Sequence, residues 1–244
     1  MKKLIFLIFL AGCLDSGTMA QSGNSNNQLA LKNVQILPKM GMEQKFEAAV
    51  LSFNRKFSED GQCIAKLRRM EFGRNAGWYT WVLGPVAYSS LNICLAKEGS
   101  YKQEWNATID PLIEEYGETN FYNLDLDLSF GLELLKKSKY YEVWSVDLKP
   151  GQENPFRELA GKLKKVYESE NRIAFLVFEN NIHRKDGPDV LMLWTFNNYD
   201  EWRKDPGPRA TYEKLFGAGT WKSALEEWNN MIVDYETDIR LMID

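Results

Sequence analysis

The chain has a single histidine, His183, among its 244 residues. A zinc site with several histidines, or an iron site with two, therefore cannot form within one chain. The sequence also lacks a glycine-rich phosphate loop, a Gly-x-Ser-x-Gly elbow and a His-Glu-x-x-His helix. We accordingly predict no metal and no cofactor. His183 lies in a polar run with turn residues, 180–188, and is interpreted as a solvated loop residue.

An excess of one charge is lacking as well. The formal net charge is −4, from 30 basic and 34 acidic residues, and both signs are interspersed. No basic stripe is present to neutralise a phosphate backbone, and nothing favours an anionic membrane surface. We therefore predict that the protein does not bind nucleic acid, and that it contacts a membrane only if it carries a lipid anchor.

The apolar run at residues 4–10 is too short to span a bilayer. It follows Lys2 and Lys3, and this order is typical of an export signal over residues 1–20. Two processing sites compete: residues 10–13 (LAGC) resemble a bacterial lipobox that would lipidate Cys13, whereas residues 18–20 (TMA) resemble an ordinary cleavage site. Either cut predicts an extracytoplasmic protein, which is periplasmic, secreted or lipid-anchored in the cell envelope. The polar residues 21–30 are interpreted as a linker.

Cysteines are few, and only Cys63 and Cys94 belong to the folded part. In an oxidising compartment they can form a disulfide if their Cα atoms come within about 7 Å. The alternative is two separately buried thiols, because cysteine is among the most buried residue types. Neither cysteine lies in a Cys-x-x-Cys motif, which argues against a redox role.

What the sequence does contain is an internal repeat. Residues 40–46 and 150–156 share Gly, Glu and Phe at the same spacing, about 110 residues apart, and each match opens an apolar-periodic helix. Similar strands at residues 122–128 and 235–241 close the two copies. We predict a first repeat over residues 31–136 and a second over residues 137–244.

Each repeat is predicted to run β-α-β-β-α-β, from apolar residues that recur at a period of 2 or 3.6. In the first repeat the expected strands are 31–37, 63–72, 77–83 and 122–130, with helices at 43–57 and 102–116. In the second the expected strands are 140–148, 173–180, 189–196 and 235–243, with helices at 155–169 and in pieces over 200–236. This order is the ferredoxin-like plan, an α+β fold whose helices cover one face of an antiparallel sheet.

The chain resembles the dimeric α/β-barrel superfamily over most of residues 31–244. The resemblance includes the Lys-Pro-Gly hinge at 149–151, the helix after it, and the strand ending at Phe196 with residues 198–202 (NYDEW). It implies two repeats packed sheet to sheet as a pseudo-dimeric barrel, as a monomer or a homodimer. Members include cofactor-free monooxygenases, isomerases, and haem-dependent enzymes that place their ligand on a helix; His183, in a loop, departs from that pattern.

The closing strands carry the strongest candidates for a site. Strict alternation places Leu124, Leu126 and Leu128 on one face, so that Asp125 and Asp127 are predicted to point away from the helices. The second copy has Asp238 and Arg240 at the matching positions. If the copies pack as a barrel, Asp125, Asp127, Asp238 and Arg240 share the space between the sheets. They are candidate proton-transfer groups, and the alternative is a structural ion pair or acids at solvated strand ends.

Large rings suggest a second kind of site. Trp81, Trp144 and Trp194 fall inside predicted strands, where they can line a cavity for a flat ligand or simply fill a core. The segment 201–209 is interpreted either as a cover for the barrel mouth or as a plain connection. The leading hypothesis is an exported protein that binds a small apolar or aromatic molecule, or a partner. The alternatives are a cofactor-independent monooxygenase or isomerase acting on an aromatic or keto substrate, and a structural envelope protein with a solid barrel.

Overall fold

The computed structural model describes residues 28–182, 187–205 and 207–243. Several sequence predictions therefore lie outside the described residues. They are the export signal over residues 1–20, the lipidation of Cys13, residues 21–27 of the linker, and the loop position of His183. The linker prediction is wrong at its end, because the first strand already begins at Gln28.

The first repeat folds in the predicted order with three helical pieces instead of one before its last strand. Its elements are β1 (Gln28–Pro38), α1 (Glu43–Phe57), β2 (Ala65–Phe72), β3 (Tyr79–Ala87), α2 (Tyr88–Ser100), α3 (Lys102–Thr108), the 3-10 helix η1 (Asp110–Leu112) and β4 (Ile113–Asp125).

A short helix, α4 (Leu132–Leu135), joins the two repeats. The elements of the second repeat are β5 (Tyr140–Leu148), α5 (Glu153–Glu170), β6 (Phe175–Asn180), β7 (Val190–Phe196), α6 (Tyr199–Lys204), α7 (Arg209–Phe216), α8 (Thr220–Met231) and β8 (Ile232–Ile243). In the part of the chain that the structure describes, no helix is both long and apolar enough to cross a membrane.

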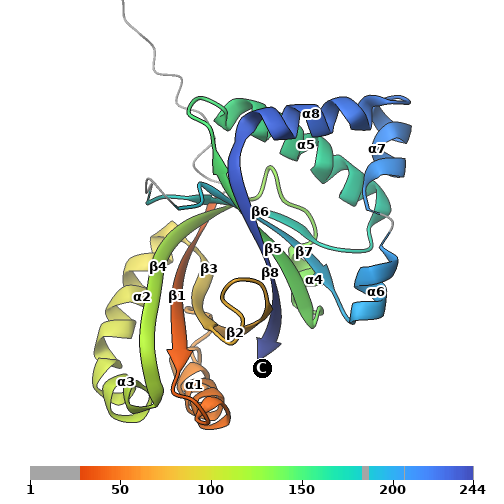
Figure 1. The fold of residues 1–244 in the computed structure, drawn as a ribbon. Coiled ribbons are helices and arrows are strands. Elements are labelled where there is room, and N and C mark those ends of the chain that lie inside the picture. Colours follow the sequence, from red (N-terminus) through yellow and green to blue (C-terminus); the bar gives the residue numbers. More distant parts are fainter. Residues whose placement is uncertain (1–27, 183–186, 206, 244) are drawn as a thin grey trace, which may run out of the picture.

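The strands close into one barrel in the order β1-β3-β2-β8-β5-β7-β6-β4 (Figure 1). The first four strands in chain order form one half and the last four the other. The halves join along two antiparallel seams, β2 with β8 and β4 with β6. Each ferredoxin-like sheet thus has no free edge, and the predicted α+β fold class is confirmed.

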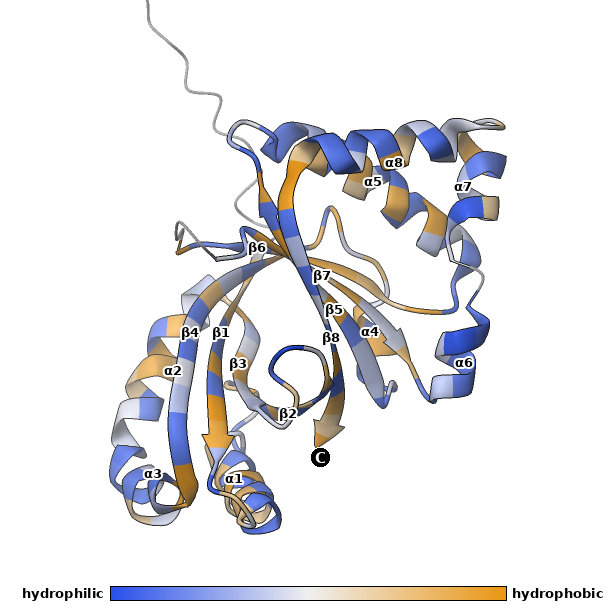
Figure 2. Cartoon of the chain, in the orientation of Figure 1, coloured by the Kyte–Doolittle hydropathy of each residue, from blue (hydrophilic) through white to orange (hydrophobic). Residues whose placement is uncertain are grey.

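Except for α4, the helices cover the outside of the barrel, each repeat having its own group (Figure 1). The apolar stripe of α1 is buried against the first sheet through Phe46, Val50, Phe53 and Phe57, which recur every three to four residues. Helix α5 does the same for the second sheet, and Figure 2 shows apolar and polar residues mixed along both helices as this one-sided burial requires. The bore of the barrel is therefore a separate environment from the two sheet–helix cores.

The prediction failed at the end of the first repeat. A helix was expected at residues 102–116 and a strand at 122–130, but β4 begins at Ile113 and ends at Asp125. The polar stretch that opens β4 hid the strand, because its side chains are mostly exposed and show little apolar alternation. The strand ends where the Asp125 carboxylate turns the chain, since its Oδ1 accepts the backbone N–H groups of Asp127 (2.8 Å) and Leu128 (3.1 Å).

Cys63 and Cys94 are joined by a disulfide, with Cα atoms 5.5 Å apart. Cys63 precedes β2 and Cys94 lies on α2, and both side chains are fully buried in the first core. The bond fastens α2, a helix that the sequence did not predict, to the start of the sheet.

Candidate functional site

The bore of the barrel opens into a cavity of ≈740 Å³ at one end. It is a wide, polar cavity, and every strand except β3 and β6 contributes to its wall. A second cavity of ≈60 Å³ lies deeper in the bore. Asn33, Leu191 and Arg240 line both, so the two cavities meet at these residues. We call them the mouth cavity and the deep cavity.

An ion pair on β8 stands at the border of the two cavities. Arg240 donates through Nε to Asp238 Oδ1 (2.5 Å) and through Nη2 to Oδ2 (2.8 Å). Although burial favours the neutral form, the carboxylate of Asp238 raises the pKa of Arg240 above its ordinary value. Gly73 lets the β2–β3 turn pass close by, because a Cβ there would lie 2.9 Å from Asp238 Cβ and its φ is +112°.

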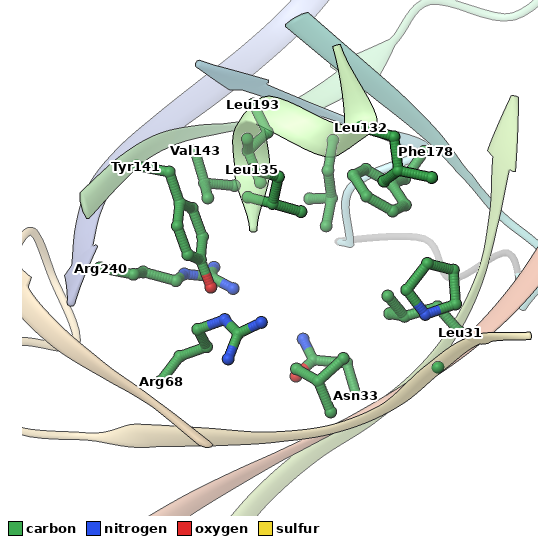
Figure 3. A pocket seen from close by; sticks show the side chains of 14 residues that line it. Leu31, Asn33, Arg68, Leu132, Leu135, Tyr141, Val143, Phe178, Leu193 and Arg240 are labelled. Atoms are coloured by element: carbon green, nitrogen blue, oxygen red, sulfur yellow. The ribbon is translucent and has the colours of Figure 1, made fainter. Parts of the chain in front are cut away.

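A second buried arginine, Arg68 on β2, faces the deep cavity beside this pair (Figure 3). Arg68 is 8 % exposed and Arg240 7 %. The guanidinium of Arg68 donates to its neighbour's carbonyl, Leu67 O (3.1 Å), and lies 5.8 Å from the ring centre of Tyr141. No ion pair with a carboxylate forms at Arg68 within the described residues. Two cations and one carboxylate therefore share this part of the bore.

Tyr141, on β5, points its hydroxyl toward both guanidinium groups (Figure 3). Burial raises the pKa of Tyr141, against the opposing influence of Arg68 and Arg240. The phenol therefore keeps its proton at neutral pH and remains a hydrogen-bond donor. The rest of the deep cavity is apolar, lined by Leu132, Leu135, Phe178 and Leu193 among others.

Three buried side-chain oxygens on the bore side have no hydrogen-bond partner among the described residues: Asn33 Oδ1, Thr80 Oγ1 and Asn120 Oδ1. Asn33 and Asn120 lie directly opposite each other on β1 and β4, and both line the mouth cavity. Buried polar atoms are normally satisfied, and leaving one unpaired costs about 1–3 kcal/mol. Their presence here is typical of a surface that meets a ligand or ordered water.

We expect Thr80→Val to raise the free energy of unfolding by about 1 kcal/mol, because it removes a fully buried hydroxyl that lacks a partner. Thr195→Val is the matched control. Thr195 is also buried, but its Oγ1 accepts the N–H of Ala174 at 2.9 Å, so its loss should lower the free energy of unfolding. Urea denaturation measures both, and equal signs for the two variants would contradict the interpretation of Thr80.

Of the four predicted site residues, the structure brings only Asp238 and Arg240 into the bore. The sequence analysis matched Asp125 and Asp127 of the first repeat with Asp238 and Arg240 of the second, and this alignment was displaced by five residues. Asn33 on β1 pairs with Asn120, just as the equivalent Val143 on β5 pairs with Asp238. The counterparts of Asp238 and Arg240 are therefore Asn120 and Tyr122. The sequence did not indicate this register, because the prediction placed the start of β4 at residue 122.

Asp125 lies on the opposite face from the one predicted. Its Oδ2 is 2.7 Å from Nη2 of Arg157, a residue of helix α5, and Arg157 also pairs with Glu179. Burial raises the pKa of Glu179, with Asp125 adding to the effect and Arg157 opposing it. Asp127 belongs to the turn that follows β4. Asp125 and Glu179 thus belong to a structural cluster with Arg157 between sheet and helix, outside the bore.

The three candidate tryptophans also face the helices. Trp81 packs among Phe53, Phe57 and Trp105, and its Nε1 donates to Asn54 Oδ1 at 2.9 Å. Trp144 and Trp194 contact each other in the second core. The structure therefore supports the alternative that these rings fill a core. None of the three tryptophans lines the bore.

The segment after β7 does not cover the mouth cavity. Trp202 on α6 lines a groove of ≈350 Å³ on the outside of the barrel, together with Phe72 and Tyr199. Its Nε1 donates to Glu142 Oε2 at 2.9 Å. This segment is thus a connection that lies against the outer surface.

The residues present do not fit a haem group held as in the haem-dependent members of the superfamily. Those members use a ligand on a helix, and the described helices contain no histidine. The described residues also contain no group of three or more histidine, cysteine or acidic side chains placed to hold a metal ion. We therefore derive no chemistry through haem or a metal.

Comparison with known proteins supports the fold. The sequence matches no protein-family model and no curated protein. Solved structures do match. A protein of Lactobacillus acidophilus, provisionally assigned as a monooxygenase, has a TM-score of 0.56 at 9% identity, over 88% of this chain and 95% of that one. An anthrone oxidase-like protein has a TM-score of 0.53 at 9% identity, over 89% and 92%.

The chlorite dismutase of Candidatus Nitrospira defluvii, in complex with imidazole, has a TM-score of 0.51 at 6% identity, over 90% and 92%. At such identities the likeness concerns the fold alone. The chain has the fold of the dimeric α/β-barrel superfamily, built here from two repeats within one chain.

Proposed function

We propose that this protein is an exported binding protein that holds a small molecule in the bore of its barrel. The observation that carries the proposal is the pair of buried, unpartnered amide oxygens of Asn33 and Asn120 on the wall of a cavity of ≈740 Å³. A cavity of that size falls within the usual range for small-molecule sites. It also disfavours the alternative of a structural protein with a solid barrel.

The lining of the bore favours a polar ligand over the apolar or aromatic one expected from the tryptophans. Acidic side chains from β5 and β8 reach the mouth cavity, namely Asp147, Asp234 and Glu236. Arg240 and Asn33 stand at its inner end. A ligand that offers hydrogen bonds and charge would replace water at these groups, whereas an apolar ligand would leave them unpaired.

The test is native mass spectrometry of the protein expressed with its own first 20 residues, followed by a thermal-shift screen of small polar metabolites. We expect a retained or added ligand whose binding is lost in Asn33→Leu/Asn120→Leu. The control is Asn123→Ala, on the same strand as Asn120 but bonded to Asn181 outside the bore. A ligand that binds equally well to all these proteins would contradict the proposed site.

The same mass spectrum tests export. We infer that the protein acts outside the cytoplasm, from the signal-like residues 1–20 and from the disulfide, which oxidising compartments favour. A mass that begins at Cys13 with added acyl chains would identify a lipoprotein, and one that begins at Gln21 an ordinary exported protein. A full-length mass with reduced cysteines would contradict export.

A cofactor-independent monooxygenase or isomerase is the second candidate, because two of the structural neighbours carry oxygenase or oxidase descriptions. Asp238 is the acid that faces the bore, but both of its oxygens are held by Arg240. Oxygen uptake with aromatic and keto substrates, abolished by Asp238→Asn in a variant that still folds, would favour this candidate over a binding protein.

A further inference from the structure

The inner end of the bore carries more positive charge than its described surroundings neutralise. Arg68 and Arg240 lie on neighbouring strands and point the same way, and Asp238 engages only Arg240. A buried charge without a partner costs several kcal/mol, and the usual remedies are a counter-charge or neutralisation. Arginine does not lose its proton in proteins, so the remedy left is an anion.

The donors at this place converge on one small space. In Figure 3 the guanidinium groups of Arg68 and Arg240, the Tyr141 hydroxyl and the Asn33 amide all point into the deep cavity. Arg240 uses Nε and Nη2 for Asp238 and Arg68 uses Nη1 for a carbonyl, so each guanidinium has further N–H groups to donate. Planar guanidinium groups suit the two oxygens of a carboxylate.

The opposite wall of the same space is apolar. Leu132 and Leu135 of α4, with Phe178 and Leu193, face the arginines across the cavity (Figure 3). This wall would leave an inorganic oxyanion with polar surface against hydrocarbon, whereas it would cover the carbon atoms of an organic acid. The volume of ≈60 Å³ accommodates roughly four to six non-hydrogen atoms, if each needs about the space of a water molecule.

We propose that the deep cavity binds a short-chain carboxylate of this size, with its carboxylate between Arg68 and Arg240 and its carbon chain against the leucines of α4. The proposal rests on the proposed function and names the ligand class of the same bore.

Calorimetric titration with sodium propionate tests the proposal on the full mature chain. We expect saturable binding to the wild type, none to the neutral propionamide, and weaker binding of both nitrate and hexanoate. Arg68→Met should weaken propionate binding by about tenfold or more, because a charge-assisted hydrogen bond is lost. It should still fold, since it removes an unpaired buried charge. Arg203→Met, at an exposed arginine of α6 paired with Asp200 outside the bore, is the matched control and should bind normally.

A variant that fills the deep cavity separates this proposal from the previous one. Leu135→Phe should exclude propionate and leave ligands of the mouth cavity unaffected. If a mouth ligand binds in the asparagine-dependent way described above but propionate does not, the carboxylate assignment is wrong and the binding function stands. If nitrate binds as tightly as propionate, the site takes inorganic anions and the assignment is also wrong. If no small molecule binds, both proposals fall.

Discussion

Asp238→Asn should lower the free energy of unfolding by about 3 to 5 kcal/mol. The reason is that Asp238 is the carboxylate bonded to Arg240, whose side chain is 8 % exposed, and a second buried guanidinium, that of Arg68, lies beside it. Asparagine keeps the shape of the side chain and removes the charge. Urea denaturation followed by circular dichroism measures the loss.

The control for Asp238→Asn is Asp234→Asn, four residues earlier on β8 and exposed at the mouth, where a change of less than about 0.5 kcal/mol is expected. If Asp238→Asn fails to fold, the double variant Asp238→Leu/Arg240→Met tests the same ion pair. Replacing both partners of a buried pair by apolar residues is often neutral, so the double variant should recover most of the stability. Two variants equally unstable would show that the pair does not act through its charges.

Removal of the disulfide is expected to cost about 3 to 4 kcal/mol, because the bond joins residues 31 positions apart and so restricts a long loop of the unfolded chain. Cys63→Ala/Cys94→Ala and the wild type in reductant should show the same loss in urea denaturation. Wild-type curves that coincide with and without reductant would contradict a stabilising bond.

The disulfide is also expected to stabilise helix α2 locally. This helix buries only Leu91 and Cys94, so its attachment to the barrel relies heavily on the bond. Hydrogen exchange should therefore rise first in Tyr88–Ser100 of the reduced protein, whereas α1, which buries five residues, stays protected. Uniform exchange over both helices would contradict this local role.

Some of the candidate site was within reach of the sequence. Asp238 and Arg240 alternate on a closing strand, and a two-residue period is a local property that can be read without knowing the neighbours. Arg68 was missed, although it follows the same rule. Residues 65–68 (AKLR) of β2 alternate between apolar and charged, and such an alternation normally indicates that the charged residues lie on a solvated face. In a barrel, the second face of the sheet is the bore, so the same pattern places a cation inside.

Asn33 and Asn120 could not be recognised as a pair before the register of β1 and β4 was known. Their importance comes from lying opposite each other without a partner, and both facts depend on strands far apart in the chain. The reversed face of Asp125 has the same origin, because its partner Arg157 belongs to the other repeat.

The sequence by itself determined the two-repeat plan, the ferredoxin-like order of elements and most of their bounds, because helix and strand periodicity are written in neighbouring residues. The tertiary structure alone decided which polar side chains face one another in the bore. Closing the barrel brings β2 beside β8 and β4 beside β6, and only that closure takes Arg68 and Arg240 out of water together. The free-energy cost of burying these two charges depends on side chains from other strands of the barrel. This cost marks the place as a candidate site.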